Sequence, residues 1–297
     1  MRLNLRIFAW LIRRSLFDAF DDGSFSTAKG AAYSALLSFF PVLASSAAIL
    51  VQTRAEFVSR TIEKALSGIV SDIVPPGTED LVVQQFRVTG ARPLSVLVVA
   101  GLVSLWAASG AVASLIEGFQ IAYRTPRSRG FLRSAGVSIG MVLLSAVPLV
   151  CASFVIFFGS QVERTVLHWM NVDPLLSPLS WVARLVSRGA RYTLAFTTLG
   201  LVACVLYYFG PNRTQRWRYV WPGAMLTSVL WLAATSGFTW YVRHLANYNV
   251  MYGSVGAGIA LLVWMYIMAA ISIVGCEFNA EYERAAAGLA AHPLQSQ

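Results

Sequence analysis

The sequence predicts an all-α, polytopic membrane protein whose chain crosses the bilayer six times. Hydrophobic residues make up 57% of the 297 residues, only 12% are charged, and the mean hydropathy is +0.61. A water-soluble domain carries about 25% charged residues, so this chain has too few charges to cover a surface in water. Six stretches without Asp, Glu, Lys or Arg are long enough for a spanning helix, which needs about 20 apolar residues. These stretches are residues 30–53, 93–116, 134–162, 192–212, 219–242 and 244–276.

The first and third stretches each contain a proline well inside the predicted span. Pro41 removes the hydrogen bond to the carbonyl of Leu37, and Pro148 does the same for Leu144. Spans one and three are therefore expected to be kinked, and broken helices often line the cavities of transporters. A static kink that packs against neighbouring helices is the alternative interpretation.

Three further segments have the pattern of amphipathic helices that lie on the membrane surface. Residues 3–20 place apolar side chains at helical spacing, with arginines elsewhere on the helix. Residues 54–73 carry one apolar stripe, which ends before Pro75 and Pro76. Residues 177–190 mix leucine and tryptophan with two arginines. In addition, Gly136 and Gly140 form a pair of small residues that is typical of close helix–helix contact.

The basic residues in the connecting loops predict the orientation of the chain. The loop after the second stretch carries four arginines against Glu117, and the loop after the fourth carries three arginines and no acid. Because positively charged loops remain in the cytoplasm, both termini are expected there, in a multi-pass protein of the bacterial inner membrane. Residues 1–297 would form a single membrane domain, with a cytoplasmic amphipathic segment at 1–29 and a cytoplasmic tail at 277–297.

Charged residues at the predicted cytoplasmic ends of the spans are the main candidates for a functional site. Glu117 and Glu277 would each end a span, where a carboxylate opposes the helix dipole. A structural cluster of salt bridges with basic residues of the same face is favoured, and the alternative is that these arginines bind a lipid phosphate. The candidate substrate-binding residues are Lys29, Tyr33, Ser34, Ser38, Pro41, Glu117, Arg124, Arg213 and Glu277.

No catalytic or metal site is expected from the sequence. The three histidines are far apart, and the three cysteines lie singly in apolar stretches, so neither set suggests zinc ligands or a disulfide framework. The chain has no phosphate-binding loop of the Gly-Lys type and no acidic residue in the middle of a span. We therefore expect no enzymatic activity, no cofactor and no nucleic-acid partner.

Several short motifs occur in a fixed order along most of the chain. They are Lys29 to Ser34, Phe40-Pro41, Ile116 to Tyr123, Pro211-Asn212-Arg213, Pro222-Gly223, Tyr248-Asn249, Tyr252-Gly253-Ser254, Trp264 with Tyr266, and Gly275 to Asn279. In this order they closely resemble the YihY/virulence factor BrkB family of bacterial inner-membrane proteins. The sequence departs from the family at Cys276, where alanine is common. The resemblance implies a six-helix membrane fold with cytoplasmic termini, in which the motif residues have structural roles.

The resemblance leaves the function open between three hypotheses. Family associations with the export of lipid precursors, together with the kinked spans, favour a protein that moves or flips a lipid or another amphiphile across the membrane. A scaffold that transports nothing and binds other envelope proteins is the alternative. The family's old label as a tRNA-processing ribonuclease, ribonuclease BN, is disfavoured, because a metal-dependent nuclease needs clustered acids or histidines and the sequence shows neither. Membrane lipids are the expected partners, and the oligomeric state stays open.

Overall fold

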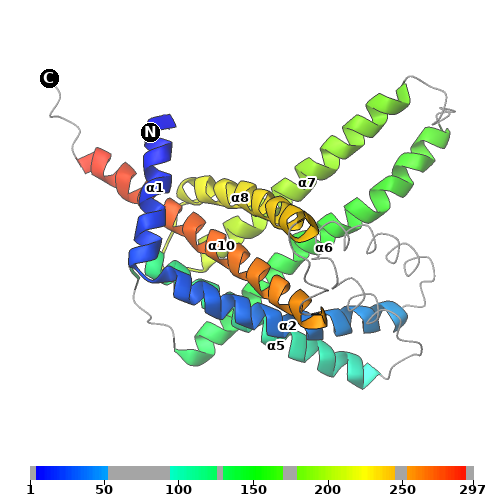
Figure 1. Cartoon of the computed structure of the whole chain (residues 1–297), viewed down its shortest axis with the longest axis horizontal. Coiled ribbons are helices and arrows are strands. Elements are labelled where there is room, and N and C mark those ends of the chain that lie inside the picture. The colour runs from blue at the N-terminus through cyan, green and yellow to red at the C-terminus, as the bar shows by residue number, and fades with distance from the viewer. Residues whose placement is uncertain (1–4, 53–93, 126–129, 170–178, 245–252, 292–297) are drawn as a thin grey trace.

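The computed structural model describes residues 5–52, 94–125, 130–169, 179–244 and 253–291. Within these ranges the chain forms seven α-helices and no strand, which confirms the predicted all-α class. Figure 1 shows the helices as labelled here. They are α1 (Leu5–Asp21), α2 (Ser24–Gln52), α5 (Leu94–Ala122), α6 (Phe131–Trp169), α7 (Leu179–Phe209), α8 (Trp217–His244) and α10 (Gly253–Ala291).

Among the described helices, four contain a stretch long and apolar enough to cross a membrane. These stretches are Val98–Ala122, Leu132–Ser153, Tyr192–Phe209 and Gly258–Ala287. α2 and α8 have comparable lengths of 29 and 28 residues, but serine, threonine, tyrosine and tryptophan lower their hydropathy. Length and composition therefore support four of the six predicted spans, and the spans within α2 and α8 stay predictions.

Two of the predicted local features differ in the structure or lie beyond it. α7 runs without a break from Leu179 to Phe209, so residues 177–190 do not form a separate surface helix where they are described. The segment 54–73 lies outside the described residues. Pro41 and Pro148 lie inside α2 and α6, and both helices continue past them. The kinks themselves stay predictions.

The helices form a bundle in which α10 is the central element. α2 and α5 lie side by side and run in opposite directions, and α10 packs against both of them as well as against α1 and α8 (Figure 1). α7 joins α8 to α6, and α6 in turn contacts α5. α1 crosses the end of the bundle at a steep angle to α2 and packs on α10 (Figure 1).

Gly23 makes the sharp corner between α1 and α2. Its φ of 68° lies in the left-handed region, which glycine adopts without steric cost. Its N–H donates to the carbonyl of Phe20 at 3.2 Å, and its own carbonyl accepts from the N–H of Ser26 at 2.9 Å. The corner therefore ends α1, starts α2 and turns α1 across the end of the bundle.

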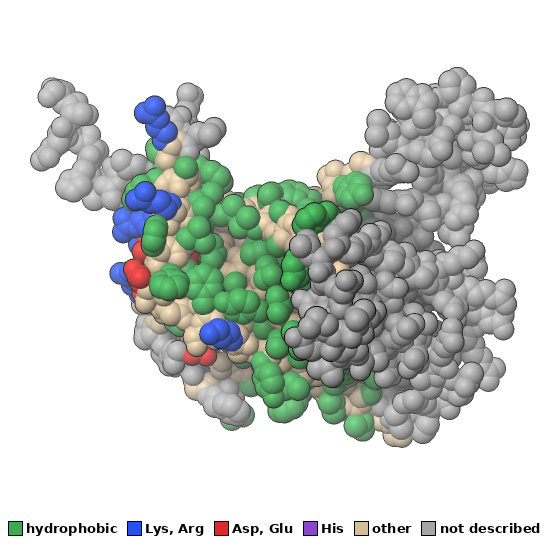
Figure 2. All heavy atoms as spheres, in the orientation of Figure 1, with side chains coloured by type: hydrophobic (Ala, Val, Ile, Leu, Met, Phe, Trp, Pro, Cys, Tyr) green, Lys and Arg blue, Asp and Glu red, His purple; other side chains and the backbone are tan. Residues whose placement is uncertain are grey.

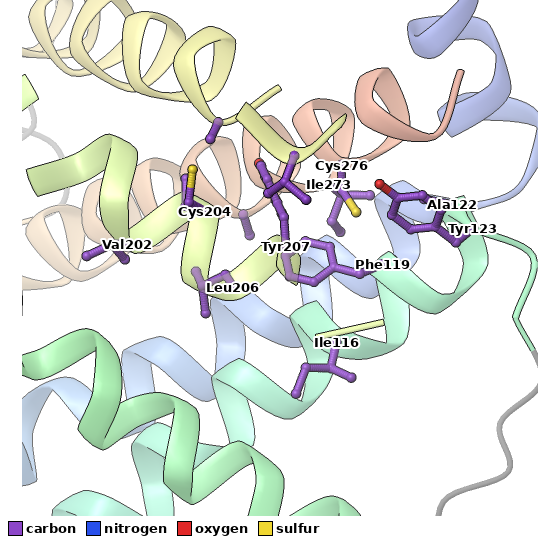
Figure 3. Close-up of a cluster of buried hydrophobic side chains, with 14 of the residues drawn as sticks. Ile116, Phe119, Ala122, Tyr123, Val202, Cys204, Leu206, Tyr207, Ile273 and Cys276 are labelled. Atoms are coloured by element: carbon purple, nitrogen blue, oxygen red, sulfur yellow. The ribbon is translucent and has the colours of Figure 1, made fainter. Parts of the chain in front are cut away.

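The buried core lies where α5, α7, α8 and α10 meet (Figure 3). The ring of Tyr207 in α7 stands edge to face with that of Phe119 in α5, with the two centroids 5.2 Å apart. The Tyr207 hydroxyl donates to the carbonyl of Ser272 in α10 at 2.7 Å and lies 2.6 Å from the hydroxyl of Thr227 in α8. Because a buried hydroxyl needs hydrogen-bond partners, this side chain fixes the position of α7 relative to both neighbours.

Small residues allow two pairs of helices to approach closely. A Cβ atom at Gly223 of α8 would collide with the carbonyl oxygen of Gly275 in α10. In the α2–α5 pair, Ser45 and Ser104 form a hydrogen bond of 2.8 Å. The predicted pair of Gly136 and Gly140 makes no such contact, because no described atom beyond α6's own backbone and the chain neighbours lies within 4 Å of a Cβ at either position. Close contact thus occurs elsewhere than the spacing in α6 suggests.

Candidate functional site

Charged side chains gather at the end of the bundle that α1 crosses. On the face shown in Figure 2, the arginine, lysine and acidic side chains of the described residues lie toward this end, while hydrophobic side chains cover the middle. Large apolar side chains stay exposed there and on other helices, including Leu132, Trp106 and Val150. An apolar belt of this kind suits contact with lipid, and the charged end suits the region where lipid meets water.

A chain of five charged residues joins α1 to α10 at this end. Glu281 in α10 is contacted on both carboxylate oxygens: Arg14 Nε lies 2.7 Å from Oε2, and Arg284 Nη1 pairs with Oε1. Arg284 Nη1 also lies 3.5 Å from Oε1 of Glu277. At the other end of the chain, Arg14 Nε lies 3.8 Å from Oδ2 of Asp18 in α1. The charges therefore alternate in sign from Asp18 to Glu277.

The two glutamates of this ion chain are buried, and Arg284 ties them to a third helix. Glu277 is 0% exposed and Glu281 is 2% exposed. Arg284 Nη2 donates to the carbonyl of Ala122 at 2.6 Å, at the C-terminal end of α5, where the helix dipole favours a cation. A buried carboxylate without a cationic neighbour would be costly, so Arg284 stabilises the folded arrangement.

The C-terminal end of α5 is closed by a Schellman motif. The N–H of Thr125 donates to the carbonyl of Gln120 at 2.9 Å, and the N–H of Arg124 donates to that of Ile121 at 2.8 Å. Arg124 holds the left-handed position of this motif, with a φ of 52°. The motif ends α5 so that the carbonyl of Ala122 is available to a side chain of α10.

A second polar group lies on the same end, between the α7–α8 loop and α10. Arg213 Nη2 lies 2.6 Å from Oε1 of Glu283, and its guanidinium stands 4.7 Å above the centre of the Tyr123 ring. Burial raises the pKa of the Tyr123 hydroxyl well above its ordinary value, so this hydroxyl stays neutral. The loop that carries Arg213 is thus held against α10 by an ion pair and a cation–π contact.

Asn279 attaches α10 to the first turns of α8. Its Oδ1 accepts from the N–H of Gly223 at 2.7 Å, and its Nδ2 donates to the carbonyl of Val220 at 2.9 Å. Pro222 lies between these two residues and has no N–H to donate. The carboxamide therefore binds the α8 backbone directly, at the point where the absence of a Cβ on Gly223 lets α10 come close.

Two apolar hollows lie on either side of α1, next to the ion chain. The inner hollow has a volume of about 350 Å³ and presents no polar surface. The outer hollow, of about 410 Å³, shares Leu16 and Phe25 with the inner one and has Arg13 on its wall. The inner hollow lies between α1, α2, α8 and α10, and its principal walls are Ile12, Leu16, Leu226, Leu230, Ile267 and Ile271.

The candidate residues on α2 do not surround either of these hollows. Lys29 is exposed near the start of α2, and Tyr33 is 59% exposed. Ser38 is buried and donates to the carbonyl of its own helix, at Ala35. Ser34 and Pro41, which complete this set, are half-buried, and Ser34 lies against α5 near Gly110.

The charged candidates fall into different places at the charged end. Glu277 and Arg213 both form ion pairs, with Arg284 and Glu283 respectively, rather than with Lys29 or Arg124. Glu117 is half-buried in α5, and Arg124 is exposed at the end of that helix. Of the motif residues, Pro211 and Gly223 are buried, Asn212, Pro222 and Trp264 are half-buried, Gly253 and Ser254 begin α10, and Tyr252 lies outside the described residues.

The sequence alone did not single out Arg14, Asp18, Glu281 or Arg284, although two spacings point to them. Glu277, Glu281 and Arg284 recur after four and three residues, which puts them on one face of a helix, and Arg14 and Asp18 are one turn apart in α1. The expectation that the chain has no cluster of acids is therefore wrong. The fold brings carboxylates of Asp18, Glu277 and Glu281 together, because α1 packs on α10.

Comparisons with known proteins agree with the membrane character of the chain. The family model described as Virulence factor BrkB matches residues 17–296. The ribonuclease-like protein YfkH of Bacillus subtilis is 27% identical over 250 residues, which cover 84% of this chain and 86% of YfkH. A UPF0761 membrane protein of Alkalilimnicola ehrlichii is 26% identical over 87% of this chain, and one of Chlorobium phaeobacteroides is 26% identical over 86%.

The chain spans only about half the length of the two UPF0761 relatives, at 55% and 54%. No solved structure matches the chain. The match to the family model covers nearly the whole sequence, in line with the motifs at Pro211, Pro222 and Asn279. The chain is therefore a membrane protein of the virulence factor BrkB family.

Proposed function

We propose that this protein binds an anionic lipid, or a similar amphiphile, beside α1 and moves it across the membrane. The observation that carries the proposal is the inner hollow, which is wholly apolar and adjoins a second hollow with an arginine on its wall. An occupant of both hollows would need an apolar tail and a polar, negatively charged head. That combination is the definition of an acidic lipid.

The size and lining of the inner hollow favour a hydrocarbon chain. Its volume of about 350 Å³ falls within the ~300–1,000 Å³ range of ligand pockets in proteins. Each methylene group that leaves water for such a surface gains about 0.8 kcal/mol. A sugar or an ion would lose its hydration here without gaining a hydrogen bond, so the hollow selects for an apolar group.

The arginine on the outer hollow supplies the charge for a head group. Arg13 lies on α1, beside Leu16, which lines both hollows. A guanidinium suits phosphate and carboxylate groups because it donates several hydrogen bonds in one plane. The net charge of +9 adds a long-range attraction toward acidic lipids.

The test uses vesicles that contain the purified protein and a fluorescent lipid, compared with vesicles without protein. Dithionite bleaches dye in the outer leaflet only, so movement of lipid increases the fraction that is lost. We expect faster loss for labelled phosphatidylglycerol than for labelled phosphatidylcholine, with or without a proton gradient. If protein-containing vesicles lose no more dye than empty vesicles under any gradient, the proposed transport is wrong.

Two tryptophan substitutions in α10 connect the activity to the inner hollow. Ile271→Trp adds volume inside the hollow, whereas Ile259→Trp adds the same volume at an exposed position of the same helix. We expect the first variant to slow lipid movement strongly and the second to leave it near the wild-type rate. Equal rates for both variants would show that the inner hollow is not the binding site.

The other functions remain outcomes of the same experiment. Binding of lipid without movement would favour the scaffold, a protein that holds other envelope proteins in place and transports nothing. The name of YfkH refers to a ribonuclease, but nothing in the described part of this chain favours that activity. A purified sample free of contaminating nuclease should leave tRNA precursors intact.

A further inference from the structure

Three carboxylates meet at the contact between α1 and α10. One oxygen each of Asp18, Glu277 and Glu281 lies within 4.8 Å of the other two. Oxygen ligands bind Ca²⁺ at about 2.3–2.6 Å, so two ligands on opposite sides of one ion are about 5 Å apart. The three oxygens are therefore close enough to share a single ion.

The carboxylate of Glu277 gives a separate indication of a missing partner. The side chain is fully buried, and neither of its carboxylate oxygens has a hydrogen-bond partner among the residues that the structure describes. Its nearest cation, Arg284 Nη1, lies 3.5 Å from Oε1, which is beyond a good hydrogen bond. Buried polar groups almost always have partners, so Oε2 in particular points to a ligand.

The charges around this group also do not balance. When ionised, Asp18, Glu277 and Glu281 carry three negative charges, and Arg14 and Arg284 supply two positive charges. Asp22, at the α1–α2 corner, is a further acid near Glu277. A buried site with excess negative charge is stabilised by a bound cation.

We propose that Asp18, Glu277 and Glu281 bind one divalent cation between α1 and α10. All three ligands are carboxylates, which favour hard ions such as Ca²⁺, Mg²⁺ and Mn²⁺ over softer metals. Glu281 is shared with Arg14, whose side chain is half exposed and is free to turn toward water when the ion enters. Arg284 stays in place through its bond to Ala122.

The test measures binding of Mn²⁺ to the full-length protein in detergent, after treatment with a chelator. Electron paramagnetic resonance reports free Mn²⁺, so its loss from solution gives the number of ions bound per chain. We expect one Mn²⁺ per chain, displaced by Ca²⁺. Absence of binding at about 1 mM free Mn²⁺, the weak end of protein Ca²⁺ sites, would overturn the proposal.

Three variants separate this site from other acids at the same end. Asp18→Asn and Glu277→Gln each remove a ligand, and we expect about tenfold weaker binding, or 1.4 kcal/mol, from either change. Glu283→Gln makes the same chemical change in α10, at a residue that pairs with Arg213 outside the cluster, and should bind as the wild type does. Unchanged affinity in both ligand variants would also overturn the proposal.

Folding and protonation are controlled in the same series. Asp18 is partly exposed, so Asp18→Asn tests the site even if the change at buried Glu277 prevents folding, which gel filtration would reveal. A proton on Glu277 would balance the charge equally well; in that case no Mn²⁺ would bind, and the cation site would be refuted. Because the assay contains no added lipid, its result is independent of the proposed transport.

Discussion

At the scale of single residues, Arg124 holds a backbone conformation that suits glycine better than arginine. Its φ of 52° costs a residue with a Cβ roughly 1–2 kcal/mol. We expect Arg124→Gly to raise the free energy of unfolding by about 1 kcal/mol, because part of the gain is offset by the greater freedom of glycine in the unfolded chain. Unfolding by titration with sodium dodecyl sulfate would measure the difference.

Arg124→Ala is the control for this prediction. Alanine removes the charge but keeps the Cβ and the strain, so its stability should stay close to that of the wild type. If alanine stabilised the protein as much as glycine, repulsion between positive charges would be the cause rather than the backbone of the Schellman motif.

Asn279 is a second residue whose effect on stability follows from its hydrogen bonds. Asn279→Ala removes the partners of the Gly223 N–H and the Val220 carbonyl. Each buried backbone group left unpaired costs about 1–3 kcal/mol, so we expect a loss of about 2–4 kcal/mol. Ser236→Ala is the matched control, since Ser236 is exposed and bonds only to its own helix. A loss no larger than that of the control would contradict the role given to Asn279.

The sequence predicted individual members of the polar cluster but not their pairing. Glu277 and Arg213 stood out because charges are rare in this chain and both lie next to an apolar stretch. Their partners, Arg284 and Glu283, lie in the C-terminal segment, which looked like a polar tail. The contact of Arg14 with Glu281 depends on how α1 packs across α10, and packing between distant segments leaves no mark in local spacing.

At the scale of helices, the absence of charge predicted where apolar segments lie but not where helices end. The window 134–162 lies inside α6, which continues to Trp169 past two charged residues, and α7 begins before two arginines. α10 continues beyond the window 244–276 to Ala291. A charge is costly within hydrocarbon but not within a helix that has left it. The windows therefore mark the apolar parts of longer helices.

The crossing of α8 and α10 yields a prediction about glycine. A Cβ at Gly275 would overlap Thr227 Oγ1 and come within 2.6 Å of the Tyr207 hydroxyl. We expect Gly275→Ala to destabilise the protein by about 1–3 kcal/mol, as overpacking does in well-packed cores. Gly258→Ala, in the same helix, meets no atom within 4 Å and should be neutral or stabilising by up to about 1 kcal/mol. Similar effects of both changes on detergent unfolding would contradict a tight crossing.

At the scale of the whole molecule, the positions of the basic loops predict its orientation. The arginine-rich segments 124–133 and 213–218 lie at the same end of the bundle as α1, in so far as they are described. We expect a reporter fused after Gln297, and one fused before Met1, to be active in the cytoplasm of a bacterial host. A reporter between residues 54 and 92 should be active outside it. Activity of the C-terminal reporter in the periplasm would contradict this arrangement.

The position of α1 has a consequence that neither proposed site has by itself. This helix supplies Asp18 to the ion chain and Leu16 to the apolar hollow, within a single helical turn. A rigid turn cannot shift at one of these residues without shifting at the other. If both sites are real, thermodynamic reciprocity requires that a cation and a lipid change each other's affinity by the same factor. The metal content of the surroundings would then regulate how tightly the protein holds its lipid.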